Sequence, residues 1–325
     1  MAEMKLITGK DAIRDALIEE MKRDPKVFLL GEDLEQATFG VTDGLIEEFG
    51  SERVRNTPIS ENAIVGAAIG AALTGMRPVA EIMFADFLMD AMDPIVNTMA
   101  KARFMTGGQA KIPMVIRTPS GAGLSAGAQH SQSPEALFMH IPGIKIAVPS
   151  TPYDMKGLLK TAIRSDDPVL FFEHKMLYYE GGDVPVGDYT LPFGKADIKR
   201  KGKDITIVAV LAMVKKALLA ADMLAADGIE VEIVDPMTLN PLDMETIIGS
   251  LKKTKRLMTI EEGARTGGIG AEIAARVAEE ALDYLDAPIK RLGGRDCPIP
   301  FSPVLEEAMY PTEDSIAAAV KQMLG

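Results

Sequence analysis

Short apolar runs alternate with helical patterns along the chain, and this alternation constrains the fold more than any other feature. Five runs in the first half have the length and composition of buried parallel strands: residues 27–30, 79–84, 114–116, 145–148 and 169–172. Helical patterns lie between them, at residues 63–73, 87–104, 134–139 and 152–163. Strands that alternate with helices predict a doubly wound α/β sheet.

A second alternation of the same kind begins near residue 205. It predicts strands at residues 205–210, 231–234 and 257–260 and helices at residues 214–226, 244–251 and 269–284. Between the two alternations, residues 180–192 are rich in Gly, Pro, Asp and Tyr, which suits a surface connector. We therefore predict two α/β domains, residues 1–185 and 204–325, joined by a linker at 186–203.

Two threonines mark helix starts in the first half. Thr8 and Thr151 are each followed three residues later by an aspartate, Asp11 and Asp154. A hydroxyl at this position accepts a hydrogen bond from the first turn of a helix. We therefore expect the first helix to begin just after Thr8 and a later one just after Thr151.

Composition excludes several classes of protein. The chain has 325 residues, 47% of them hydrophobic, enough for two domains with cores of their own. Its formal net charge of -12 argues against a nucleic-acid partner, because phosphate binding needs clustered Lys and Arg. The single cysteine, Cys297, cannot form an internal disulfide, so we expect a cytoplasmic location. The longest uncharged stretch is about 15 residues, whereas a membrane span needs roughly 20, so we expect no membrane association.

Glu61 stands at the expected start of a helix, directly after Ser60, a good N-cap residue. One interpretation is a carboxylate that only interacts with the helix dipole, worth roughly 0.3–1 kcal/mol. The other is a functional carboxyl, because residues 66–72 of this helix are mostly Gly and Ala. We expect other groups to approach such a helix closely and to cover it on all sides, which would place Glu61 in a poorly solvated cleft.

Two further segments contain candidate functional residues. Phe87 follows an expected strand, at the carboxyl edge where α/β folds bind ligands, and is either a stacking platform for a flat heterocycle or a core aromatic. The glycine-rich segment 121–133 matches neither the phosphate-binding loop nor the dinucleotide fingerprint. We interpret it as a flexible loop that delivers His130, and we expect His140 and His174 to be structural.

Taken in order, these residues carry a family resemblance that runs along essentially the whole chain. The motifs are Ser60-Glu61, Arg-Pro-Val-Ala-Glu at 77–81, Phe-Ala-Asp-Phe at 84–87, Gln-His-Ser-Gln at 129–132, residues 149–159, and Leu-Asp-Ala-Pro at 285–288. Together they closely resemble the β subunits of thiamine-diphosphate-dependent 2-oxo-acid dehydrogenases, which are transketolase-like. The resemblance implies a pyrimidine-binding domain followed by a transketolase C-terminal domain.

The resemblance also implies partners. Such enzymes hold the cofactor's diphosphate and Mg²⁺ with a Gly-Asp-Gly motif and a later Asn, and this sequence has no Gly-Asp-Gly. A separate α subunit is therefore expected to hold them in an α₂β₂ assembly, with the β chain inactive alone. The acetyl product is expected to pass to the lipoamide of an acyltransferase core, whose basic binding domain would meet Asp286.

Individual roles follow from the same resemblance. Glu61 matches the glutamate that hydrogen-bonds the aminopyrimidine ring, Phe87 matches the ring that stacks on it, and His130 matches a histidine near the substrate. Asp93 matches an acidic residue proposed to join paired cofactor sites, or is a helix-surface carboxylate. A structural K⁺ is implied at four backbone carbonyls, those of Met114, Ala162, Ser165 and Asp167.

The sequence leaves several substrates possible. Residues 31–45 are fewer than in typical pyruvate enzymes, and residues 140–143, 172–178 and 192–194 look more like acetoin dehydrogenase β chains. We favour acetoin over pyruvate, with branched-chain oxo acids third. One alternative is the C-terminal half of a split transketolase. Ketose transfer needs several basic or His side chains to bind a sugar phosphate, and the three histidines of this chain disfavour it. Another is a non-catalytic homologue, expected to lack Glu61 or His130.

Overall fold

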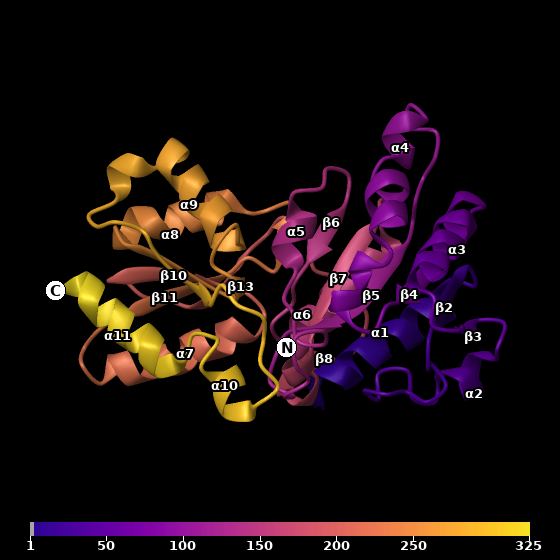
Figure 1. The fold of residues 1–325 in the computed structure, drawn as a ribbon, viewed down its shortest axis with the longest axis horizontal. Helices are drawn as coiled ribbons and strands as arrows, with labels where there is room; N and C mark the ends of the chain where they lie inside the picture. Colours follow the sequence, from indigo (N-terminus) through magenta and orange to yellow (C-terminus); the bar gives the residue numbers. More distant parts are fainter. Residues whose placement is uncertain (1–2) are drawn as a thin grey trace. The chain divides into compact units, whose positions relative to one another are not determined.

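The computed structural model describes residues 3–325, which form two compact units (Figure 1). The first unit contains the chain up to Ser120 together with Leu137–Phe193. The second contains Gly121–Ala136 together with Gly194–Gly325. The division between Phe193 and Gly194 falls inside the expected linker, whereas the assignment of Gly121–Ala136 to the second unit has no counterpart in the predicted ranges.

The first unit is built on a parallel sheet whose strands lie in the order β6-β7-β5-β4-β2-β3. Their bounds are β2 (Val27–Gly31), β3 (Val54–Asn56), β4 (Arg77–Glu81), β5 (Val115–Ser120), β6 (Lys145–Ala147) and β7 (Val169–His174). Every residue of β2, β5 and β7 is buried, as in parallel sheets covered on both faces. The predicted α/β class is confirmed, although the apolar pattern does not predict β3.

The helices of this part of the chain begin largely where their caps predict. Thr8 accepts a hydrogen bond from the backbone of Asp11, and Thr151 accepts one from the backbone of Asp154. The helices are α1 (Gly9–Arg23), α2 (Leu45–Phe49), α3 (Glu61–Leu73), α5 (Glu135–Met139) and α6 (Pro152–Arg164). A short 3₁₀ helix, η3 (Lys175–Tyr179), follows β7. Strands β1 (Met4–Thr8) and β8 (Gly181–Pro185) pair antiparallel, a pairing that the sequence pattern does not predict.

One expected helix is wrong as a continuous element. Residues 87–104 lie in three short pieces: the 3₁₀ helix η1 (Ala85–Met89), the π-helix η2 (Pro94–Met99) and α4 (Ala102–Met105). Pro94 lacks a backbone N–H and its ring clashes with the carbonyl four residues earlier, so an α-helix cannot run through this position undisturbed. The apolar periodicity alone does not show the break.

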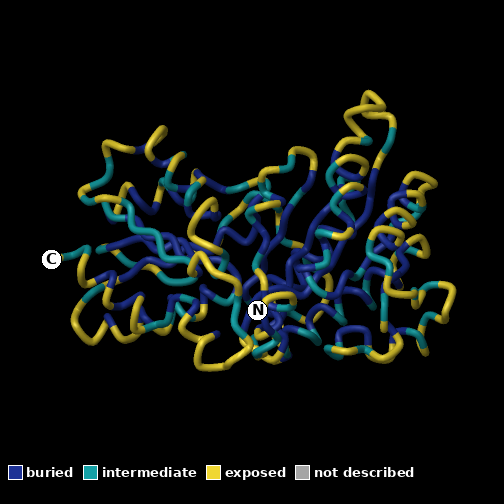
Figure 2. The backbone as a smooth tube through the Cα atoms, viewed as in Figure 1, coloured by how far each residue is buried: buried dark blue, intermediate teal, exposed yellow. Residues whose placement is uncertain are grey.

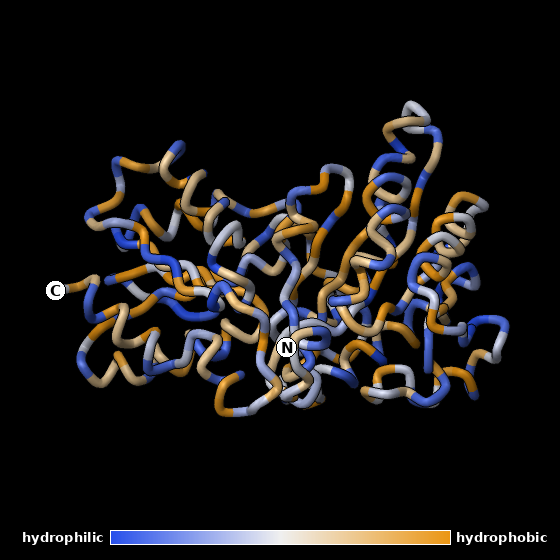
Figure 3. The backbone as a smooth tube through the Cα atoms, viewed as in Figure 1, coloured by the Kyte–Doolittle hydropathy of each residue, from blue (hydrophilic) through white to orange (hydrophobic). Residues whose placement is uncertain are grey.

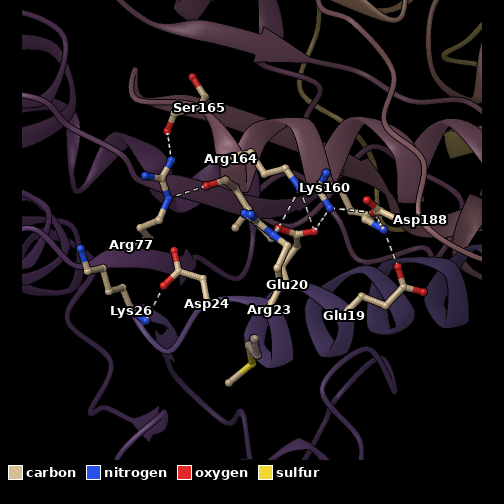
Figure 4. Close-up of polar contacts among 12 residues, drawn as sticks. Glu19, Glu20, Arg23, Asp24, Lys26, Arg77, Lys160, Arg164, Ser165 and Asp188 are labelled. Atoms are coloured by element: carbon tan, nitrogen blue, oxygen red, sulfur yellow. Dashed lines mark hydrogen bonds and ion pairs between the residues drawn. The ribbon is translucent and has the colours of Figure 1, made fainter.

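Helices α1 and α6 pack against each other and share buried charges (Figure 4). The Glu20 carboxylate is fully buried and accepts hydrogen bonds from Arg23 at 2.8 Å and Arg164 at 2.6 Å. Lys160, also buried, donates to Glu19 and forms an ion pair with Asp188 at 2.5 Å. Hydrogen bonds from Arg164 and Lys160 hold the pKa of Asp188 well below its ordinary value. Each buried charge is therefore paired, as burial requires.

The second unit has a sheet in the order β14-β13-β10-β11-β9, parallel except for β9. Figure 1 shows α8 and α9 on one face and α7 and α11 on the other. The strands are β9 (Asp197–Arg200), β10 (Ile205–Ala209), β11 (Val231–Asp235), β13 (Leu257–Ala264) and β14 (Lys290–Gly294), with a short β12 (Thr238–Asn240). The helices are α7 (Ala212–Ala225), α8 (Met244–Thr254), α9 (Ile269–Glu280), the 3₁₀ helix η4 (Leu282–Tyr284), α10 (Pro303–Glu307) and α11 (Glu313–Leu324).

Burial follows the sheets in each unit. The strands are largely dark blue in Figure 2, and many of the same segments are orange in Figure 3. Aliphatic side chains of β10, β11 and β13 form one cluster with those of α7 and α11. None of the helices among residues 3–325 combines the length and the apolar character needed to cross a membrane.

Candidate functional site

Glu61 is the first residue of α3 and is half-buried at its amino end. Ser60 occupies the N-cap position, but its hydroxyl donates to the carbonyl of Pro58 at 3.1 Å and makes no capping hydrogen bond. The expected Ser60 cap is therefore wrong. The side chain of Asn62 reaches the carbonyl of Asp90 at 3.5 Å, so the start of α3 lies beside the end of η1, the element that contains Phe87.

The expectation that α3 is covered on all sides is also wrong within this chain. One face packs inward through Ile64, Val65, Ala68, Ile69 and Ala72. The opposite face is exposed and consists mainly of Asn62, Ala63, Gly66, Ala67 and Gly70. Apart from the adjacent residues and the helix's own backbone, no heavy atom among residues 3–325 lies within 4 Å of a Cβ built at Gly66 or Gly70. The sequence does not predict which face of α3 is buried, because Ala and Gly occur on both faces and give no apolar periodicity.

Two further carboxyl groups lie close to each other at the carboxyl edge of the sheet. Glu32 directly follows Gly31, the last residue of β2, and Gly31 pairs with Glu81, the last residue of β4. Burial raises the pKa of Glu32, and the negative charges of Glu61, Asp33 and Glu81 raise it further. Glu32 Oε2 is buried with no hydrogen-bond partner among the described residues. Glu32 and Glu81 therefore form an acidic edge of the sheet, and Glu32 contributes a desolvated carboxyl group to it.

Arg117, in β5, connects the neighbouring strands β4 and β7. Its guanidinium donates to both oxygens of Glu173, at 2.7 and 2.8 Å, and to Glu81 at 2.7 Å. The Tyr178 hydroxyl donates to Glu173 at 2.6 Å. Burial raises the pKa of Glu81, against the opposing effect of Arg117. Burial alone would lower the pKa of Arg117, but the charges of Glu173 and Glu81 hold it above its ordinary value.

Phe87 is half-buried in η1, at the carboxyl edge of the sheet where the sequence placed it. Other aromatic rings of the first unit also gather here. Phe39 lies 5.7 Å from Phe84 and 5.5 Å from Tyr178 between ring centroids. The Lys175 ammonium lies 4.9 Å from the Phe84 centroid. This edge thus combines carboxyl groups, which can hydrogen-bond to ring nitrogens, with aromatic faces, on which a flat heterocycle can stack.

His130 lies in the segment Gly121–Ala136, within the second unit, and is half-buried. Its backbone N–H donates to the carbonyl of Gly127 at 3.4 Å. The other histidines differ from it. His174 is buried and its Nδ1 accepts a hydrogen bond from the backbone of Met176, which fits the structural role expected of it. His140 is exposed, and the structural role expected of it stays a prediction.

The carbonyls predicted for potassium lie at the start of β5, at the end of α6 and in the turn before β7: Met114, Ala162, Ser165 and Asp167. The Ser165 carbonyl accepts a hydrogen bond from Arg77 at 2.6 Å (Figure 4). Burial would raise the pKa of the Asp167 carboxyl, but the ion pairs with Lys145 and Arg103 lower it. Three of the four predicted ligands already accept hydrogen bonds: the Ser165 carbonyl from Arg77, the Met114 carbonyl from the backbone of Val169 at 3.0 Å, and the Ala162 carbonyl from the backbone of Ser165 at 3.1 Å.

The two remaining candidates are acidic surface residues. Asp286 follows η4 and lines an open pocket with Leu282, Leu285, Pro288 and Ile289. Asp93 immediately precedes η2, is exposed, and accepts a hydrogen bond from Asn97 at 2.8 Å. Asp286 is thus surrounded by apolar side chains, whereas the hydrogen bond to Asp93 comes from a residue one helical turn away.

Comparison with family models matches both halves of the chain. Residues 5–180 match the transketolase pyrimidine binding domain, and residues 194–316 match the transketolase C-terminal domain. A solved structure described as a split gene transketolase, inactive β4 tetramer, superposes with a TM-score of 0.81. It is 29% identical, and the match covers 98% of both chains.

Three curated relatives are similar to this chain over nearly their full length. The chain is 48% identical to the acetoin:2,6-dichlorophenolindophenol oxidoreductase subunit beta of Bacillus subtilis, covering 99% of this chain and 98% of that protein. It is equally 48% identical to the pyruvate dehydrogenase E1 component subunit beta of Rickettsia felis, covering 98% of each. The 2-oxoisovalerate dehydrogenase subunit beta of Bacillus subtilis is also 48% identical, over 98% of this chain and 99% of that protein.

Proposed function

This chain belongs to the family of thiamine-diphosphate-dependent 2-oxo-acid and acetoin dehydrogenase β subunits. On this basis we propose that it cleaves acetoin together with an α subunit and passes the acetyl group to lipoamide. The observation that carries the proposal is the position of Glu61, at the amino end of α3 beside the desolvated Glu32. Pyruvate and branched-chain 2-oxo acids are the alternative substrates.

The division of labour between two chains has support in both sequence and structure. The sequence contains no Gly-Asp-Gly for the diphosphate and Mg²⁺. The exposed small-residue face of α3 leaves room for another chain directly beside Glu61. We propose that an α subunit covers this face, holds the diphosphate and Mg²⁺, and completes an α₂β₂ assembly with a two-fold axis.

The chain's own residues would then bind and orient one half of the cofactor. When bound, thiamine diphosphate supplies the carbon nucleophile that breaks the C–C bond. The Glu61 carboxyl would share a proton with the aminopyrimidine ring nitrogen, and Phe87 would stack on that ring. His130 would donate a hydrogen bond or proton to a substrate oxygen that develops charge. The acidic edge formed by Glu32 and Glu81 suits a ligand that presents ring nitrogens.

The ranking of substrates rests on sequence segments, because the acetoin, pyruvate and 2-oxoisovalerate relatives are all 48% identical. The split transketolase is less similar, at 29% identity, and for that reason we prefer a dehydrogenase function to a transketolase function.

For the acyltransferase core we propose Asp286 and its pocket as the contact, since a chain of net charge -12 suits a basic partner. We propose a cytoplasmic location and, at the Met114, Ala162, Ser165 and Asp167 carbonyls, a structural K⁺.

Glu61→Gln in the assembled α/β enzyme tests the proposal. Gln keeps the shape and a hydrogen bond but cannot relay a proton, so we expect kcat to fall roughly 10²–10⁴-fold with assembly preserved. Hydrogen–deuterium exchange at the thiazolium carbon of the bound cofactor reports proton removal before any substrate chemistry, and it should slow in parallel.

The matched control for this variant is Glu47→Gln, an exposed acidic residue in the first turn of α2. If Glu61 only interacted with its helix dipole, both variants would lose at most about 1 kcal/mol of stability and keep their turnover. Wild-type exchange in a Glu61→Gln enzyme with cofactor bound would refute the assignment. Substrate preference is measured on the same preparation, where a tenfold advantage for pyruvate in kcat/KM would reverse our ranking.

A further inference from the structure

The segment Gly121–Ala136 has an irregular backbone. Up to Gln132 it lacks regular secondary structure, and four of its residues have positive φ angles: Gly121 at 84°, Gly123 at 106°, Ser125 at 53° and Gly127 at 77°. Ser125 adopts the left-handed region without the freedom of glycine, at a conformational cost. A loop of this composition has many alternative conformations in isolation, so external contacts must select the one observed.

Two carboxylates of the second unit provide those contacts. Glu306, at the end of α10, accepts hydrogen bonds from the backbone N–H of Gly123 at 3.2 Å and of Ser125 at 3.0 Å, and from the Ser125 hydroxyl at 3.3 Å. Glu262, in β13, accepts one from the backbone N–H of Ala122 at 2.5 Å and lies 3.5 Å from the Ser133 hydroxyl. The loop is therefore anchored on both sides of His130.

The Glu306 contact is specific to the loop. Glu306 is only 4% exposed, and it forms no ion pair with any residue among 3–325. All its hydrogen-bond donors belong to the loop. A buried carboxylate without a cation is costly unless strong donors satisfy it, and backbone N–H groups aimed at both oxygens do so. Because one N–H engages each oxygen, replacing either oxygen by an NH₂ group leaves a loop donor without an acceptor.

We propose that Glu306 is a positioning residue, whose carboxylate holds the loop in the conformation that presents His130 to the substrate. This inference rests on the proposed role of His130 and extends it by assigning the residue that sets the loop. Glu262 is the second anchor of the same loop. In the proposed function, Glu61 and Phe87 of the first unit would hold the cofactor's pyrimidine half, so we expect Glu306 to affect the substrate step and not cofactor activation.

The test compares Glu306→Gln with Glu307→Gln, the adjacent residue of α10, which is exposed. The first readout is backbone amide exchange of residues 121–133 in the assembled α/β protein without substrate. We expect exchange at Gly123 and Ser125 to accelerate about tenfold or more in Glu306→Gln and not in the control. This readout is independent of catalysis.

The second readout separates positioning from a general structural role. In Glu306→Gln we expect kcat to fall about 10²-fold, the size of effect that a misplaced catalytic group produces. The cofactor concentration for half-saturation and deuterium exchange at the thiazolium carbon should stay at wild-type values. Glu306→Asp keeps both acceptor oxygens and should recover part of the lost turnover. If Glu306→Gln fails to assemble, Glu262→Gln tests the second anchor with the same measurements.

Several results would overturn the proposal. They are loop exchange and turnover equal to the Glu307→Gln control, faster loop exchange with full turnover, or loss of exchange at the cofactor carbon together with turnover. Failure of the proposed function is a separate result. If the wild-type enzyme cleaves neither acetoin nor a 2-oxo acid, the amide-exchange comparison still decides whether Glu306 holds the loop.

Discussion

Glu261 makes the stability of this protein depend on pH in a defined direction. It lies in β13 with 2% of its surface exposed. Its two oxygens accept hydrogen bonds from the backbone N–H groups of Ile269 at 2.7 Å and Gly270 at 2.9 Å, at the start of α9. Burial raises the pKa of Glu261 to about 7, although these hydrogen bonds and the charge of Arg291 act to lower it. The desolvation of the carboxylate therefore outweighs its partners.

The sign of the effect follows from proton binding. Because the folded carboxyl has a pKa of about 7 and the ordinary value is 4.5, the folded state retains its proton to higher pH than the unfolded state. The stabilisation is complete below pH 4.5 and is lost as the pH rises through 7. At about 1.36 kcal/mol per pKa unit, the full effect is about 3 kcal/mol, most of it lost between pH 5 and pH 8.

Glu261→Gln removes this titration. We expect the free energy of unfolding of the wild type, relative to the variant, to fall by about 2–3 kcal/mol between pH 5 and pH 8. Urea unfolding at matched pH values measures this difference, and a constant offset from the lost acceptor oxygen does not affect the slope. Glu279→Gln, an exposed residue of α9, is the control for the charge change. A wild-type pH slope in Glu261→Gln would refute the reasoning.

Two other predictions concern helix packing and helix ends. Glu20→Gln should lower the free energy of unfolding by about 2 kcal/mol, because Arg23 and Arg164 lose a buried charged acceptor; a loss under about 0.5 kcal/mol in urea unfolding would contradict it. Thr151→Ala and Thr8→Ala should each cost about 1 kcal/mol, since each hydroxyl accepts a hydrogen bond from the first turn of its helix. Thermal unfolding measures both, and replacement by Ser should restore most of the loss.

Local sequence signals were sufficient for much of the architecture. The apolar runs that became β2, β5, β7, β10 and β11 are buried along their whole length, and capping hydroxyls identify the starts of α1 and α6. Buried strands and helix starts depend on residues a few positions apart, so the apolar periodicity and the capping residues predict them directly. The predictions for Glu61 and Phe87 rest on a related reason, because the ends of strands and the starts of helices meet at the ligand-binding edge of such sheets.

Three features were decided only by tertiary structure. The network of Glu81, Arg117 and Glu173 joins three strands that are separate in sequence but adjacent in the sheet, and strand order is not visible in local periodicity. The exposed face of α3 depends on which side of a uniformly apolar helix meets the sheet. The anchoring of the His130 loop joins Ser125 to Glu306, 181 positions apart, through backbone donors that carry no side-chain signature. Local sequence predicts the helices and strands and where they end. Contacts between distant segments depend on the packing of the whole unit, because each such contact forms only when many weak interactions bring the segments together.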